Sequence, residues 1–106
     1  MRNHPQIIKE RLLAEVLAER SRQDIIWGEQ NYNDYYWLAI LGEEFGEVCR
    51  ALIEKSVVVF PVVEDMNGME LHSIRNNPFK EHLKKEIIQV AAVCIAWLEC
   101  IERRKK

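Results

Sequence analysis

The strongest constraint on the fold is the segment 87–98, in which every residue except Gln89 is apolar. It is too short for a membrane span, so we expect a helix that is buried on several sides. A chain of 106 residues holds too few other helices to surround it. We therefore predict that a second copy of the chain completes the core, in a homodimer or a homotetramer.

Apolar residues recur at three- and four-residue steps in three parts of the chain, which is typical of amphipathic helices. Pro5 suits the first turn of the first one, where its missing N–H is not needed. The sequence thus predicts an all-α fold, a helical bundle formed by a single domain over residues 1–106, with helices over residues 5–26, 35–55 and 78–103.

Polar residues mark where the later helices begin. Asp34 is the candidate N-cap of the second helix, and Asn77 caps the third just before Pro78. Residues 56–75 between these helices contain a β-branched run and an Asn-Gly turn signal. We predict a small β-hairpin there, with its turn at residues 66–68.

Charge and cysteine content exclude several classes of protein. Fifteen basic and seventeen acidic residues give a net charge of −2, which argues against a nucleic-acid partner. Three cysteines without a paired spacing predict reduced thiols rather than a disulfide framework. The N-terminal residues lack the apolar core of a secretory signal, so we expect a cytoplasmic protein with no membrane partner.

An acidic stripe lies within the apolar second helix. Glu43, Glu44 and Glu47 share one helical face, and Gly42 and Gly46 flank them. Carboxylates in apolar surroundings are paired, solvated in a cleft or bound to a cation. The alternative is an ordinary solvent-facing strip, and the glycines indicate either close helix packing or room for a ligand.

A second polar pair, Glu86 and Gln89, lies three positions apart near the start of the third helix. The two helices should pack antiparallel, but the sequence leaves open whether this pair lies opposite Glu44 and Glu47. If it does, three carboxylates and one amide oxygen converge, a set of hard oxygen ligands suited to Mg²⁺ or Mn²⁺. If it does not, the two pairs are ordinary polar turns.

The ordered set of motifs resembles the MazG-like family of all-α nucleotide pyrophosphohydrolases, whose pattern is ExxE on one helix and ExxD on the next. Glu44-Phe-Gly-Glu47 matches the first pair, and Glu86-Ile-Ile-Gln89 matches the second except at its last position. The segment 19–23, which reads ERSRQ, and Trp27-Gly28 resemble further segments of one branch of that family.

The resemblance implies Mg²⁺-dependent cleavage of a nucleoside or deoxynucleoside triphosphate to the monophosphate and pyrophosphate. It implies that Glu44, Glu47 and Glu86 are metal ligands, and that Glu43 is either a ligand or the group that orients water. It also implies a helical bundle completed by a second subunit. Gln89 stands where the family has Asp, and its neutral amide can still offer one oxygen to a metal.

Two other interpretations remain open at this point. The first is a catalytically weakened nucleotide-binding or interaction module of the same fold, which the neutral Gln89 favours. The second is a purely structural helical oligomer, which does not account for the acidic residues on an apolar helix.

Five further residues are candidates for substrate binding. Arg50 and Lys85 either contact phosphates or form ion pairs with neighbouring glutamates. Trp27 either stacks on a nucleobase or anchors its loop. Arg20 and Gln23 either line the base side of the site or tie the first helix to the loop.

Overall fold

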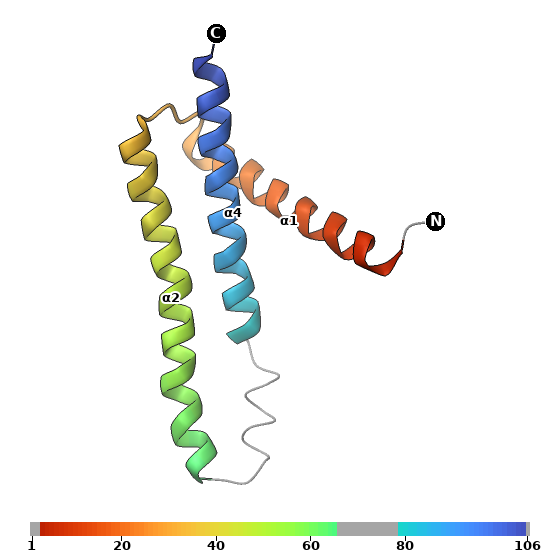
Figure 1. Cartoon of the computed structure of the whole chain (residues 1–106), viewed down its shortest axis with the longest axis vertical. Coiled ribbons are helices and arrows are strands. Elements are labelled where there is room, and N and C mark those ends of the chain that lie inside the picture. Colours follow the sequence, from red (N-terminus) through yellow and green to blue (C-terminus); the bar gives the residue numbers. More distant parts are fainter. Residues whose placement is uncertain (1–2, 66–78, 106) are drawn as a thin grey trace.

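The computed structural model describes residues 3–65 and 79–105. It contains three helices, α1 (His4–Trp27), α2 (Asp34–Asp65) and α4 (Phe79–Arg104) (Figure 1). The described residues contain no strand, so the all-α class is confirmed. None of the helices in these two ranges is long and apolar enough to cross a membrane.

The prediction of a β-hairpin is wrong for its first strand. Residues 56–65 continue α2 as a helix to Asp65 instead of leaving it at residue 55. Residues added to an existing helix need no new nucleation step, and β-branched residues lower helix propensity only slightly. The expected turn, the second strand and the Asn77 cap lie outside the described residues.

Asn3 begins α1 through a reciprocal pair of hydrogen bonds. The backbone N–H of Gln6 donates to Asn3 Oδ1 over 2.9 Å, and the backbone N–H of Asn3 donates to Gln6 Oε1 over 3.0 Å. This is a capping box that satisfies two otherwise unpaired donors. Pro5 occupies the first turn, as predicted.

Asn33, and not Asp34, is the N-cap of α2. Its side-chain oxygen accepts from the backbone N–H of Tyr36 over 2.9 Å. Asp34 is instead the first helical residue, where its carboxylate accepts from Trp97 Nε1 over 2.9 Å and from Arg104 over 2.6 Å. Asn and Asp are equally good caps, so these two donors from α4 decide which residue takes the role.

The core lies between α2 and α4, which run antiparallel (Figure 1). Trp37 from α2 is buried against Val93, Ala96 and Cys100 from α4. Small α4 residues leave space for the indole of Trp37, which is 1% exposed. The antiparallel arrangement expected from the sequence is confirmed.

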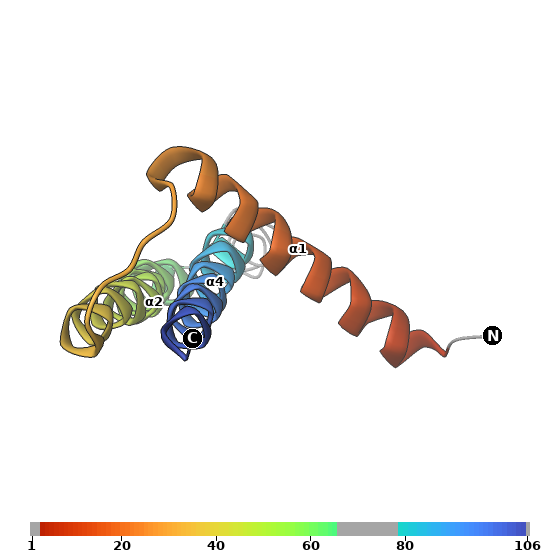
Figure 2. The ribbon, with the colours of Figure 1, turned by 90° about the horizontal axis from the view of Figure 1, so that it is seen from above.

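The C-terminal half of α1 contacts α4, and the N-terminal half of α1 projects away from the other two helices (Figure 2). Leu13 and Leu17 on α1 are about half exposed. On α4, Ile87 is 50% and Leu98 is 59% exposed. A single chain therefore leaves part of the apolar surface of α4 uncovered.

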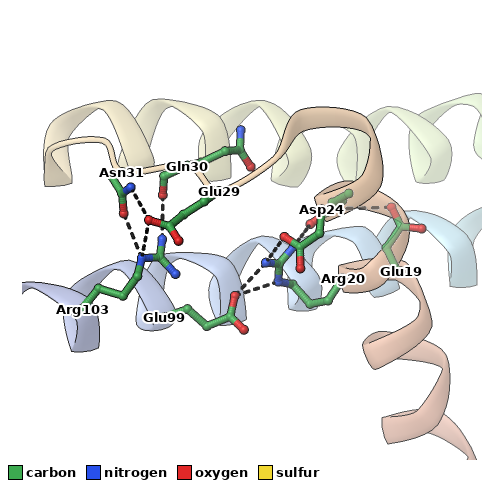
Figure 3. A network of polar contacts seen from close by, with 9 residues as sticks. Glu19, Arg20, Asp24, Glu29, Gln30, Asn31, Glu99 and Arg103 are labelled. Carbon is green, nitrogen blue, oxygen red and sulfur yellow. Dashed lines mark hydrogen bonds and ion pairs between the residues drawn. The ribbon is translucent and has the colours of Figure 1, made fainter.

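Arg20 ties α1 to α4 (Figure 3). Its side chain is 10% exposed and donates to Glu99 of α4 from Nε over 3.1 Å and from a terminal nitrogen over 2.7 Å. The same guanidinium donates to Asp24 and Gln23 on its own helix. These contacts fix the C-terminal part of α1 against the C-terminal part of α4.

The loop after α1 is held by the C-terminal end of α4 (Figure 3). Gly28 ends α1 with a φ of 70°, a conformation that favours glycine, and its N–H donates to the Asp24 carbonyl. Arg103 then donates to the Gln30 carbonyl and to Asn31 Oδ1, each over 2.9 Å. The loop is therefore ordered by α4 rather than by its own residues alone.

Replacing Arg20 tests this tie. We expect Arg20→Met to lower the free energy of unfolding by about 1.5–3 kcal/mol, the range for hydrogen bonds to a charged partner. Lys105→Met is the control, because Lys105 pairs with Glu102 at the surface, where their side chains are 68% and 69% exposed and a pair contributes about 1 kcal/mol or less. Urea unfolding of both variants measures the difference, and equal losses would contradict a role for Arg20 between helices.

Candidate functional site

Glu44, Glu86 and Gln89 meet at the interface between α2 and α4. With its nitrogen on the side that faces the carboxylates, the Gln89 amide donates to Glu86 Oε2 over 3.2 Å and to Glu44 Oε2 over 3.3 Å. The sequence left the register of the two helices open. The structure brings Glu86 and Gln89 to Glu44, one member of the first pair.

The carboxylates in this cluster lie partly out of solvent and close to one another. Glu86 is 9% exposed, although its side chain is acidic. Burial raises the pKa of the Glu44 carboxyl, and the negative charges of Glu86, Glu47, Glu43 and Glu19 raise it further. The position of Glu44 therefore favours a proton or a cation.

Glu47 is engaged elsewhere in its own helix. Its carboxylate forms a short ion pair with Arg50, one turn further along α2. This is the surface pair that the sequence offered as the alternative role of Arg50. Both side chains are more than 40% exposed, so the pair contributes little to stability and can open at low cost.

The donor atoms that converge are two carboxylates and one amide. Among residues 3–65 and 79–105, no three His, Cys, Asp or Glu side chains form a group that could hold a metal ion. The chemistry of the set nevertheless fits Mg²⁺, which usually keeps several waters and binds through one or two carboxylates together with substrate phosphates. Glu47 adds a third carboxylate only when it leaves Arg50.

An aromatic cavity of about 290 Å³ adjoins this cluster. Glu43 and Glu44 line it, so it extends to the acidic residues. Its other walls combine aromatic rings with two side-chain amides, contributed by Trp27, Tyr32, Tyr36, Trp37, Gln23 and Gln30. Flat apolar walls with a few polar groups are typical of sites for small planar ligands.

The aromatic walls are positioned by contacts with one another. The ring of Tyr32 meets the ring of Tyr36 edge to face at a centroid distance of 4.3 Å, and that of Trp37 at 5.3 Å. Gln30 donates to the Tyr32 hydroxyl over 3.2 Å. Because Trp37 belongs to the core, this series of contacts links the cavity wall to the α2–α4 packing.

The substrate-binding candidates divide between this cavity and other places. Trp27, 66% exposed, and Gln23 line the aromatic cavity. Arg20 lines a separate polar cavity of about 180 Å³ beside Glu99, and its guanidinium is used in the tie between α1 and α4. Lys85 lines a third cavity of about 360 Å³ between α1 and α4, where cations and carboxylates alternate. The structure thus does not bring Arg20, Arg50 or Lys85 to the aromatic cavity.

Sequence reasoning missed Tyr32, Tyr36 and Gln30 as cavity residues. A signal for Tyr36 was present, because positions 36, 40, 43 and 44 follow the three- and four-residue steps of one helical face. Extending the acidic face of α2 backwards by two turns therefore leads to Tyr36. Tyr32 and Gln30 lie in the loop, whose path the periodicity of the helices does not predict.

The glycines beside the acidic residues are not used for close packing within the described chain. A Cβ atom placed on Gly42 or Gly46 would meet no other atom within 4 Å. Of the two explanations offered by the sequence, close packing inside one chain is therefore wrong for the described residues. Open space remains above this part of α2.

Comparison of the chain with protein-family models, with curated proteins and with solved structures finds no match.

Proposed function

We propose that this chain is a divalent-metal-dependent nucleotide pyrophosphohydrolase similar to the MazG-like family. It cleaves nucleoside or deoxynucleoside triphosphates to the monophosphate and pyrophosphate. The observation that carries the proposal is the meeting of Glu44, Glu86 and Gln89 from two helices, next to an aromatic cavity that Glu44 also lines.

The acidic cluster provides the groups for a cation. Glu44 and Glu86 are the residues that would hold Mg²⁺, and Gln89 would add its amide oxygen only after the amide turns over, because its nitrogen faces the two carboxylates. Mn²⁺ suits the same ligands. Glu47 would be available as a further ligand when its carboxylate leaves Arg50. A bound Mg²⁺ would neutralise phosphate charge and lower the pKa of a water molecule, so the reaction needs no protein nucleophile.

Glu43 has a different role in the proposal. It is exposed and lines the aromatic cavity together with Glu44, while Glu44 and Glu86 are turned toward Gln89. A carboxylate in that position can orient a water molecule and accept its proton. Glu43 is therefore the general base in this scheme.

The aromatic cavity provides the site for the nucleobase. Its volume of about 290 Å³ is close to the lower end of the range for small-molecule sites, roughly 300–1,000 Å³. Trp27 and Tyr36 are exposed enough to stack on a base, and the amides of Gln23 and Gln30 can hydrogen-bond to its edge. With the base held there, the phosphates extend toward Glu44.

The second candidate is a nucleotide-binding or interaction module with little catalysis. It is favoured by the ion pair between Glu47 and Arg50 and by the neutral side chain at position 89. Among the side chains that the structure describes, this leaves Glu44 and Glu86 as the carboxylates that face Gln89. A module of this kind would bind the same ligands in the same cavity.

Pyrophosphate release distinguishes the two candidates. We expect release from at least one member of a panel of ribo- and deoxyribonucleoside triphosphates with Mg²⁺ or Mn²⁺, and none with chelator. Glu86→Gln should lower kcat by roughly 100-fold or more, the scale seen when one group that stabilises transition-state charge is lost. Glu102→Gln, which lies on the same helix in a surface ion pair, is the control and should keep full activity.

Two negative results have different meanings in this assay. No release, with metal and nucleotide binding still measurable by calorimetry, would move the assignment to the binding module. No release and no binding would contradict both candidates.

The cavity is tested through the Michaelis constant. We expect Tyr36→Ala to raise KM by roughly 5- to 100-fold with kcat changed little, since stacking of a base on an aromatic ring contributes about 1–3 kcal/mol. Tyr35→Ala is the matched control, because Tyr35 is 86% exposed and does not line the cavity. An unchanged KM for Tyr36→Ala would place the base elsewhere.

Assembly with a second copy belongs to the proposal as well. Leu38, Phe45 and Leu52 follow one another at seven-residue steps on α2 and are 47–60% exposed. Gly42 lies on the same stripe with open space above it, so another helix can approach closely there. The self-complementary contact of a homodimer, or of a tetramer built from two dimers, would cover this stripe.

Sedimentation equilibrium tests the assembly. We expect the unaltered chain to sediment as two or four copies, and Phe45→Glu to raise the dissociation constant by roughly 10-fold or more, because a charge is buried in an apolar contact. Ile25→Glu is the control, as Ile25 is exposed on α1 away from the stripe. A monomeric unaltered chain would remove assembly from the proposal.

A further inference from the structure

The position of Gln89 has a consequence for the protein without metal. Packing of Trp37 against Val93 and Ala96 fixes the register of α2 and α4. That register places Glu44 and Glu86 at one point, although both are acidic side chains. The charges that act most strongly on Glu44 all come from carboxylates, so like charges have to be held together at this point.

A primary amide is suited to this task because it has two N–H groups on one nitrogen. With the Gln89 amide assigned so that its nitrogen faces the carboxylates, this nitrogen lies 3.2 Å from Glu86 Oε2 and 3.3 Å from Glu44 Oε2. One donor is thus available for each helix, and both bonds are to charged acceptors, which are stronger than bonds between neutral groups. An aspartate at this position would add a third negative charge and remove both donors.

We propose that Gln89 is a positioning residue whose amide holds Glu44 and Glu86 together in the metal-free protein, in the place where a cation otherwise does so. The acidic site of this chain is therefore assembled before metal binds. The same amide competes with the cation for the two carboxylates, so this assembly is accompanied by weaker metal binding. The prediction of weaker metal binding rests on the function proposed above. The two hydrogen bonds from Gln89 to Glu44 and Glu86, which we call the bridge, do not depend on that function.

The bridge is tested in chelator, where no metal contributes. Gln89→Met keeps the length of the side chain and removes both donors. We expect it to lower Tm by roughly 4–8 °C, the effect of losing about one net hydrogen bond in a domain of this size. The same change in a Glu86→Gln background should lower Tm by less than half as much, because only one carboxylate then remains to be held.

The Gln89→Met and Glu86→Gln variants, alone and combined, form a double-mutant cycle. A control cycle uses Glu81→Gln in place of Glu86→Gln. Glu81 is exposed on the same helix and is not among the partners of Gln89. The effects of Gln89→Met and Glu81→Gln should add, whereas those of Gln89→Met and Glu86→Gln should not. Additive effects in both cycles would overturn the bridge.

Titration with Mn²⁺ separates a bridge from simple packing. We expect Gln89→Asp to unfold at a lower temperature than the unaltered chain in chelator, to bind Mn²⁺ at least 10-fold more tightly by electron paramagnetic resonance, and to regain its Tm with Mn²⁺. Gln89→Met should not regain its Tm. Equal responses of the two variants to Mn²⁺ would overturn the inference, because a packing role does not depend on charge.

The metal site and the bridge are contradicted by different results. Absence of Mn²⁺ binding by both the unaltered chain and Gln89→Asp would contradict the proposed metal site, and the cycle in chelator would still decide whether the bridge exists. Additive effects in that cycle, with Mn²⁺ binding intact, would overturn the bridge and leave the proposed function standing.

Discussion

The packing of Trp37 between α2 and α4 is the contact on which the rest of the structure depends. A large ring buried against Val93, Ala96 and Cys100 admits only one register of the two helices, because a shift by one turn would place the indole against other side chains. The meeting of Glu44 with Glu86 follows from this register. The aromatic cavity depends on the same residue, since Trp37 forms part of its wall.

The position of α1 depends on charge rather than on apolar contact. Arg20 holds it through Glu99, while several leucine and isoleucine side chains of α1 stay exposed in the single chain. The loop that follows is attached in a similar way by Arg103. The cavity wall is thus built from two parts, a rigid helix pair and a segment joined to it by ion pairs and hydrogen bonds. The first part carries the acidic residues, and the second carries Trp27 and Gln23.

Periodicity was sufficient to predict the three helices and the face that Glu43, Glu44 and Glu47 share, because both follow from local geometry. It was insufficient for the end of α2, where a β-branched run continues a helix, and for the register that joins Glu44 to Glu86, which depends on packing between helices. Periodicity also did not predict that Arg20 joins α1 to α4, since its partner Glu99 is 79 positions away. Contacts between residues distant in sequence account for the register and for the role of Arg20, whereas the longer α2 reflects local propagation of a helix that has already begun.

Each predicted metal ligand forms an ion pair or a hydrogen bond in the structure. Glu47 is paired with Arg50, and Glu44 and Glu86 share the amide of Gln89. Such partners lower the electrostatic free energy of clustered carboxylates, so the helices can pack without an ion. Any cation that binds must displace them, and its net affinity is reduced by the free energy of the contacts it replaces. A site of this kind favours a metal that arrives with the phosphates of a nucleotide, because those oxygens supply ligands that the protein does not.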